Sequence, residues 1–268
     1  MKNKKRGVLA FLLALFLISI GNITAHAAVL INLGNASQFG VLAGAGITNT
    51  GTTTITGDIG TFPTTTITGL GTVVLNGTNH AGDSVTQSAK PDLVSAYDNA
   101  AGQAVSTQYG TTQELGGLTL SGGVYNVSAS FGVTGTLTLN GDANSVWIFQ
   151  MGSTLTTASN SHISLTGGAQ ASHVFWQVGS SATLGTNSQF SGTILAMDSI
   201  TLTTGAAILG EVLARNGAVT MDGNTINAVP EPSSILLSVF GAVAVFGSIR
   251  YHCKKKGTQK GAQKRDLG

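Results

Sequence analysis

The stretch SITLTTGAAILGEVLARNGAVTMDG (199–223) decides the fold, because it holds one full repeat of a short strand unit. Thr201-Leu202 and Thr220-Met221 are the same polar–apolar pair, 19 residues apart, with glycines between them. Alternation of β-branched polar residues with apolar residues predicts short strands that bury one face. A repeat of this length is typical of a solenoid, in which each coil buries its apolar face against its neighbours.

The same pair recurs along most of the chain. The six threonines that precede an apolar residue in this way are Thr119, Thr138, Thr154, Thr183, Thr201 and Thr220, at steps of 19, 16, 29, 18 and 19. The long step separates two similar segments, NGDANSVWIFQMGSTL (140–155) and TGGAQASHVFWQVGSSATL (166–184). We therefore expect an extra half-turn around residues 159–163, with Trp147 and Trp176 at equivalent core positions. The prediction is a mostly β fold, an irregular parallel β-solenoid.

One segment breaks the strand pattern. From Ser88 to about Thr107 the small and apolar residues follow helical spacing, and Pro91 suits a first turn. We expect one long α-helix over about 88–107, packed along the side of the solenoid through Leu93 and Tyr97.

Both ends of the chain carry export signals. Basic residues, an apolar run and the triplet Ala25-His26-Ala27 predict a signal peptide over 1–27, with an uncleaved N-terminal anchor as the alternative. Near the other end, Pro230-Glu231-Pro232 precedes an uncharged apolar stretch (233–249) and a Lys-rich tail. This order, over 228–268, resembles a PEP-CTERM sorting signal, although such a tail is more often a short Arg cluster. The resemblance implies an exosortase-type processing enzyme as a partner; an ordinary C-terminal membrane anchor is the alternative.

The charge of the body excludes one class of partner. Residues 28–229 contain two basic residues against nine acidic ones, a net charge of −7. Such a surface repels phosphate backbones, so nucleic-acid binding is not expected. The predicted location is exported, at the cell surface or extracellular, and anchored in a membrane at least transiently by the C-terminal span.

Six segments of the body resemble, in the same order, the ice-binding-like family of secreted bacterial, fungal and algal proteins. They are INLGNASQFGVLAGAGITNTGTTTITGDIG (31–60), AYDNAAG (96–102), ELGGLTLSGGVY (114–125), VWIFQMGSTLT (146–156), VFWQVGSSATLGT (174–186) and TLTTGAAILGEVLARNGAVTMDGNTI (201–226). The resemblance implies a domain over 28–227 with a right-handed solenoid of triangular section and one long helix alongside. It also implies that the first and last coils are neighbours, and that one flat face binds ice.

Two sets of residues are candidates for that face. Stiff threonine side chains at regular spacing, each able to donate and accept, could hold ordered water or contact an ice crystal surface. The first set follows the family's Thr-Ala/Gly-x-Thr/Asn pattern, which Thr157-Ala158-Ser159-Asn160 matches in full and two later coils match in part; it comprises Thr157, Ser159, Asn160, Thr186, Ser188 and Thr204. The alternative set comprises the six threonines of the repeat, Thr119, Thr138, Thr154, Thr183, Thr201 and Thr220.

Other chemistry has weaker support in the sequence. Asp198, Glu211 and Asp222 recur at coil-like intervals, but turn positions explain them more simply than a catalytic pair does. The histidines lack metal-ligand spacing. We therefore expect no catalytic residue, cofactor or metal. The competing function is a structural or adhesive surface protein without ice activity, with extracellular polysaccharide as its partner.

Overall fold

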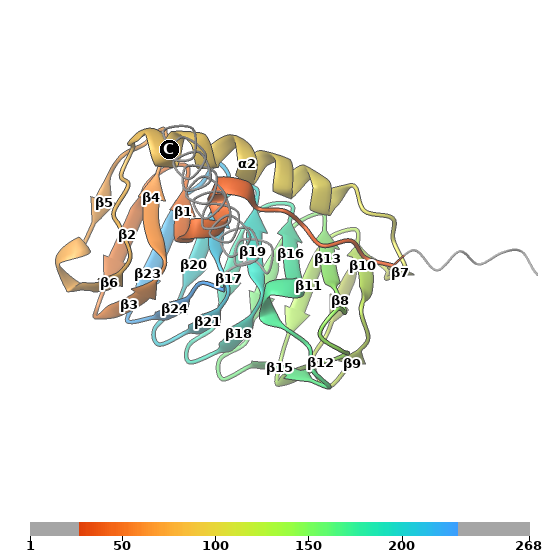
Figure 1. The fold of residues 1–268 in the computed structure, drawn as a ribbon. Coiled ribbons are helices and arrows are strands. Elements are labelled where there is room, and N and C mark those ends of the chain that lie inside the picture. Colours follow the sequence, from red (N-terminus) through yellow and green to blue (C-terminus); the bar gives the residue numbers. More distant parts are fainter. Residues whose placement is uncertain (1–26, 230–268) are drawn as a thin grey trace, which may run out of the picture.

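The computed structural model describes residues 27–229, which form a solenoid of three parallel eight-stranded sheets with one long helix alongside (Figure 1). The predicted signal peptide over 1–27, apart from Ala27, lies outside these residues, as do the Pro-Glu-Pro motif, the predicted span over 233–249 and the basic tail.

Each coil of the solenoid gives one strand to each sheet. Sheet A contains, in spatial order, β4 (Asp58–Thr61), β1 (Phe39–Ala43), β22 (Val212–Ala214), β19 (Thr193–Ala196), β16 (Val174–Val178), β13 (Trp147–Met151), β10 (Gly123–Val127) and β7 (Thr107–Gln108). Sheet B contains β5 (Ile67–Thr68), β2 (Ile47–Thr50), β23 (Val219–Asp222), β20 (Ile200–Leu202), β17 (Ala182–Leu184), β14 (Leu155–Thr157), β11 (Ser130–Val133) and β8 (Thr112–Glu114). Sheet C contains β6 (Val73–Asn76), β3 (Thr53–Thr56), β24 (Thr225–Asn227), β21 (Ala207–Leu209), β18 (Gln189–Ser191), β15 (His162–Thr166), β12 (Thr136–Asn140) and β9 (Thr119–Leu120).

The chain does not wind in one direction only. It forms β1 to β3, then β4 to β6 at one end, crosses the whole length in helix α2, and winds back from β7. The last coil therefore packs against the first, with Val41 paired to Val212 and Thr48 paired to Thr220. The implied adjacency of first and last coils is confirmed. Three short 3-10 helices, η1 (Gly34–Gln38), η2 (Leu70–Thr72) and η3 (Ala171–His173), complete the described elements.

Helix α2 spans Ser84–Ala101, so the expected bounds of 88–107 were wrong at both ends. It begins earlier because the Asp83 side chain accepts hydrogen bonds from the backbone N–H groups of Val85 and Thr86, as an N-cap does. Pro91 therefore lies in the helix interior. The Gln87 carbonyl, which Pro91 cannot pair, belongs to an exposed residue and can meet water.

The helix covers the outer side of sheet A. Leu93 and Tyr97 are buried, as expected, against outward-facing residues of the sheet such as Ile148, Phe175 and Leu195. Lys90 also lies in this interface, where its Nζ donates to the carbonyl oxygens of Ala214 at 3.0 Å and Arg215 at 2.6 Å. Sheet A is thus closed to solvent along much of its length.

The interior of the solenoid is an apolar column in which aromatic rings from successive coils stack. The rings of Phe149 and Trp176 are 3.9 Å apart and nearly parallel, and Tyr125 stacks on Phe149 at 5.4 Å. Trp147 and Trp176 are both fully buried, which confirms their core placement. They are not equivalent, because Trp176 pairs with Phe149 and Trp147 pairs with Val174.

The irregularity lies elsewhere than expected. His162 and Ile163 are ordinary residues of β15, paired with β12, so residues 159–163 contain no extra half-turn. The additional residues form long connections from sheet C to sheet A, over 141–146 and 167–173. These connections lengthen two coils while the strands of sheet B stay in register.

Lys90 gives the fold a testable pH dependence. Burial lowers the pKa of Lys90 to about 8, below its usual 10.5. Between these values the unfolded chain binds the proton that the folded chain has released, so the free energy of unfolding should rise with pH from about 8 to 10. Urea unfolding at pH 7.5, 8.5 and 9.5 should show this rise in the parent and not in a Lys90→Met variant. Equal slopes would contradict the assignment.

Candidate functional site

Sheet B presents six threonines in one line across adjacent strands. We call Thr68, Thr48, Thr220, Thr201, Thr183 and Thr156 the threonine row; each pairs in register with the next, from β5 to β14. Gly132 and Glu114 continue the line on β11 and β8. Neighbouring strands in a sheet lie about 4.7–4.9 Å apart, so the row is a regular array with that repeat.

Strand alternation points these threonines outward. The residues on either side of five of them, for example Ile200 and Leu202 around Thr201, are buried. At Thr68, in the end strand β5, Ile67 is half-buried and Gly69 is exposed. Thr48, Thr68, Thr156, Thr183 and Thr220 are exposed, and Thr201 is half-buried.

Hydrogen bonding separates the threonine row from the hydroxyls beside it. Within residues 27–229, none of the six threonine hydroxyls has a hydrogen-bond partner in the protein. The preceding outward positions differ: Ser130 and Thr154 bond each other at 2.8 Å, and the Ser199 hydroxyl accepts from the Ala218 N–H at 3.1 Å. The hydroxyls of the threonine row are therefore available to water or to a solid that presents water molecules.

The corner between sheets B and C is built by residues with left-handed backbone. Gly51, Gly223 and Gly205 stack there with Asn187 (φ 56°) and Asn160 (φ 58°), and asparagine is among the few non-glycine residues that adopt this conformation readily. The Asp222 carboxylate lies just before this turn and accepts from the Thr204 and Thr50 hydroxyls, which together hold the pKa of Asp222 below its usual value.

The first candidate set belongs mainly to this corner. Thr157 is 3% exposed, and its Oγ1 accepts from the Gly185 N–H at 2.9 Å. Ser188 is 1% exposed. Only Ser159, Asn160, Thr186 and Thr204 reach the surface, at the edge of sheet B rather than on its face. The full match to the Thr-Ala-x-Asn pattern at 157–160 is thus a turn in which the threonine points inward.

The alternative set divides between two sheets. Thr183, Thr201 and Thr220 belong to the threonine row, whereas Thr119 and Thr138 pair with each other on sheet C. Thr154 lies two residues before the row's own member, Thr156. Sequence reasoning missed Thr48, Thr68 and Thr156, because the reversal of the chain after the helix and the two lengthened coils hide their alignment.

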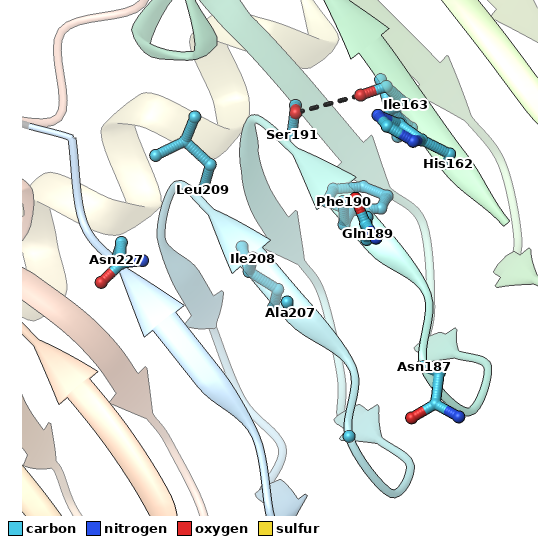
Figure 2. A pocket seen from close by; sticks show the side chains of 11 residues that line it. His162, Ile163, Asn187, Gln189, Phe190, Ser191, Ala207, Ile208, Leu209 and Asn227 are labelled. Carbon is cyan, nitrogen blue, oxygen red and sulfur yellow. Dashed lines mark hydrogen bonds between the residues drawn. The ribbon is translucent and has the colours of Figure 1, made fainter. Parts of the chain in front are cut away.

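Sheet C offers a different surface. Its outward positions are mixed: Val74, Thr54, Thr225, Ala207, Gln189, His162 and Thr136 follow one another in register. Between β15 and β24 it is hollowed into an open groove of about 500 Å³, lined by residues that include Gln189, Ala207, Leu209 and Asn227 (Figure 2). Beside this groove β15 and β18 share a single paired position, His162 with Gln189.

The carboxylates weighed as a catalytic pair lie apart. Asp198 is at the corner from sheet A to sheet B, Asp222 at the corner from B to C, and Glu211 at the corner from C to A. His80 binds Asp83 at 2.7 Å and Asp58 at 3.2 Å, and the hydrogen bond to Asp83 is the main cause of its raised pKa. No cluster of residues able to hold a metal ion occurs within 27–229.

The comparisons with known proteins agree with this architecture. The family model described as Ice-binding-like matches residues 41–227. This chain belongs to the ice-binding-like family. It is 45% identical to an ice-binding protein of Nostoc sp. (strain HG1), over 92% of this chain and 96% of the relative.

Solved structures of this family share the fold. The crystal structure of an ice-binding protein from the Antarctic ascomycete Antarctomyces psychrotrophicus matches with a TM-score of 0.73 and 41% identity, over 75% of this chain and 99% of that one. One domain of the Shewanella frigidimarina ice-binding protein 1 matches with a TM-score of 0.70 and 30% identity, over 76% of this chain and 99% of the domain structure. Among the helices that the structure describes, none has the length and apolar character needed to cross a membrane.

The two kinds of threonine should differ in stability effects. Thr183→Val removes a hydroxyl without a protein partner and should change the free energy of unfolding by less than about 0.5 kcal/mol. Thr157→Val leaves the Gly185 N–H without its acceptor and should cost about 1 kcal/mol. Urea unfolding of both variants beside the parent makes the comparison. Equal changes in the free energy of unfolding would contradict the assignment of a hydrogen-bond partner to Thr157 alone.

Proposed function

We propose that this ice-binding-like protein binds ice through sheet B, with the threonine row as the centre of the contact surface. The observation that carries the proposal is the set of six threonine hydroxyls in strict register, none of which is satisfied by the described part of the protein. An ice-binding relative at 45% identity supports ice binding independently.

The physical argument rests on order rather than on any single strong bond. Each hydroxyl can donate and accept, and each β-branched side chain is stiff at χ1, so ordering water on the row costs little side-chain entropy. Strand spacing fixes the hydroxyls along the solenoid at about 4.8 Å. Water held at such a regular array can match a crystal plane, and many weak contacts together make adsorption persistent.

The faces that flank sheet B suit this role less well. Helix α2 covers sheet A, and sheet C has mixed side chains and a groove. The corner residues of the first candidate set, Thr186 and Thr204 above all, border sheet B and extend its polar surface, whereas the burial of Thr157 and Ser188 leaves those two to build the turn.

The proposed cellular location rests on the two sorting segments that the sequence predicts. The predicted signal peptide directs export, and the PEP-CTERM-like segment, read by an exosortase-type enzyme, holds the solenoid at the cell surface at least transiently through the apolar stretch over 233–249. Both features are proposals from sequence, outside the described residues.

An ice-recrystallisation assay tests the proposed face. Purified residues 28–229 should slow recrystallisation, and Thr183→Tyr, Thr201→Tyr and Thr220→Tyr together should abolish the effect, because large rings break the regular array. The matched control places three tyrosines on sheet C, at Thr54, Thr225 and Thr136, and should retain activity. Loss only in the sheet C variant would move the contact surface there, and a folded but inactive parent would refute ice binding.

A second candidate function, adhesion to a neutral extracellular polysaccharide, is favoured by the groove on sheet C. Its carboxamides, from Asn187, Gln189 and Asn227, can pair with hydroxyls, and Leu209 adds an apolar wall. If this function holds, a Gln189→Ala, Asn227→Ala variant should lose retention on immobilised neutral exopolysaccharide while keeping the threonine row intact. Equal retention of parent and variant would exclude the groove.

A further inference from the structure

The described chain leaves the solenoid at a fixed point. After β24, the Ala228 N–H donates to the Thr56 carbonyl at 2.9 Å, and the Val229 N–H donates to Oε1 of Glu211, also at 2.9 Å. Glu211 is 1% exposed, and its other carboxylate oxygen accepts from the Thr193 hydroxyl. A buried carboxylate is costly unless hydrogen-bonded, so this arrangement holds the exit residue firmly to the coil.

The exit lies at the corner from sheet C to sheet A. Glu211 connects β21 of sheet C with β22 of sheet A, and Ala228 occupies the corresponding place one coil away. In a solenoid with three sheets, this corner is the one that does not border sheet B. The exit and the threonine row are therefore on opposite sides of the molecule.

The other end of the described chain avoids sheet B as well. Residues before η1 run beside α2 over sheet A (Figure 1), and Val29 exchanges two hydrogen bonds with Gln103, just past the end of α2. Neither end of residues 27–229 therefore crosses or shadows the threonine row.

We infer that the C-terminal exit beside Glu211 fixes the orientation of the solenoid. Sheet B then faces away from the cell surface to which residues 230–268 attach the protein. The inference rests on the proposed function. It adds that the lipid-bearing cell surface and the ice lie on opposite sides of the solenoid. The sequence makes the direction matter. Only Pro230, Glu231 and Pro232 separate Val229 from the apolar stretch that begins at Ser233.

A link this short restricts reorientation. The four chain steps from Val229 to Ser233 reach at most about 14 Å when fully extended. With so little slack, a solenoid mounted by a corner next to sheet B would trap that sheet against the surface. Mounting by the opposite corner keeps the whole threonine row accessible to a flat crystal.

Tethering in defined orientations tests the inference. The matched structure from Antarctomyces psychrotrophicus consists almost wholly of the solenoid, so residues 28–229 are a suitable folded unit. Streptavidin beads would carry this unit, at equal density, through a biotin placed directly after Val229 or through a biotinylated Thr112→Cys, an exposed position of sheet B on β8 outside the threonine row. The introduced cysteine is unique, because the chain's one cysteine is Cys253. Bead capture by a growing ice front is the measurement.

Beads tethered after Val229 should be captured, beads tethered at residue 112 should not, and adding Thr201→Tyr to the C-terminal tether should abolish capture. If C-terminally tethered beads fail while the same protein in solution inhibits recrystallisation, the orientation is wrong and ice binding stands. If capture is the same for both tethers, the mounting has no directional role and the inference is overturned. A protein inactive in solution would refute the proposed function itself.

Discussion

In-register hydrogen bonding between parallel strands of successive coils is the constraint on which the rest of the structure depends. Because eight coils stack in this way, every outward position of sheet B repeats at the strand spacing, and every inward position joins one apolar column. The same hydrogen bonds keep the strands paired although the coils differ in length. The extra residues lie in the connections over 141–146 and 167–173, so the register of sheet B continues through both long coils, from Thr183 to Thr156 and on to Gly132.

The three sheets carry different side chains because they have different neighbours. Sheet A has apolar residues on both sides, since its outer side packs against α2 and η1. The inner side of sheet C is apolar and faces the core, whereas its outer side carries side chains of several kinds and a groove. On sheet B, threonine occupies six successive outward positions of one line, over a buried inner side. The long helix α2 and both ends of residues 27–229 lie away from the outer side of sheet B.

The corner between sheets B and C shows how one short pattern can serve structure instead of surface. In Thr157-Ala158-Ser159-Asn160 the first residue satisfies the N–H of Gly185 in the next coil, and the last adopts a left-handed backbone, as Gly205 and Gly223 do at the same place in later coils. The pattern forms a turn whose last residue, asparagine or glycine, adopts the left-handed backbone conformation. Its threonine is polar because the turn needs an acceptor, so the pattern alone does not identify a contact surface.

Sequence alone determined the class of fold and the kind of surface, because period and alternation are local properties: Thr201-Leu202 and Thr220-Met221 already contain the coil length and the two faces. It also placed a helix near residues 88–107, but an N-cap at Asp83 and not the apolar spacing set where that helix begins. Only the tertiary structure decided which threonines share a row. Thr48 and Thr220 are neighbours across 172 positions of sequence because α2 carries the chain to the far end and the later coils wind back to the first ones. Thr156, and not Thr154, pairs with Thr183, two residues away from the alignment that the sequence favours. Strand register is a property of the folded pair, and no single strand's sequence contains it.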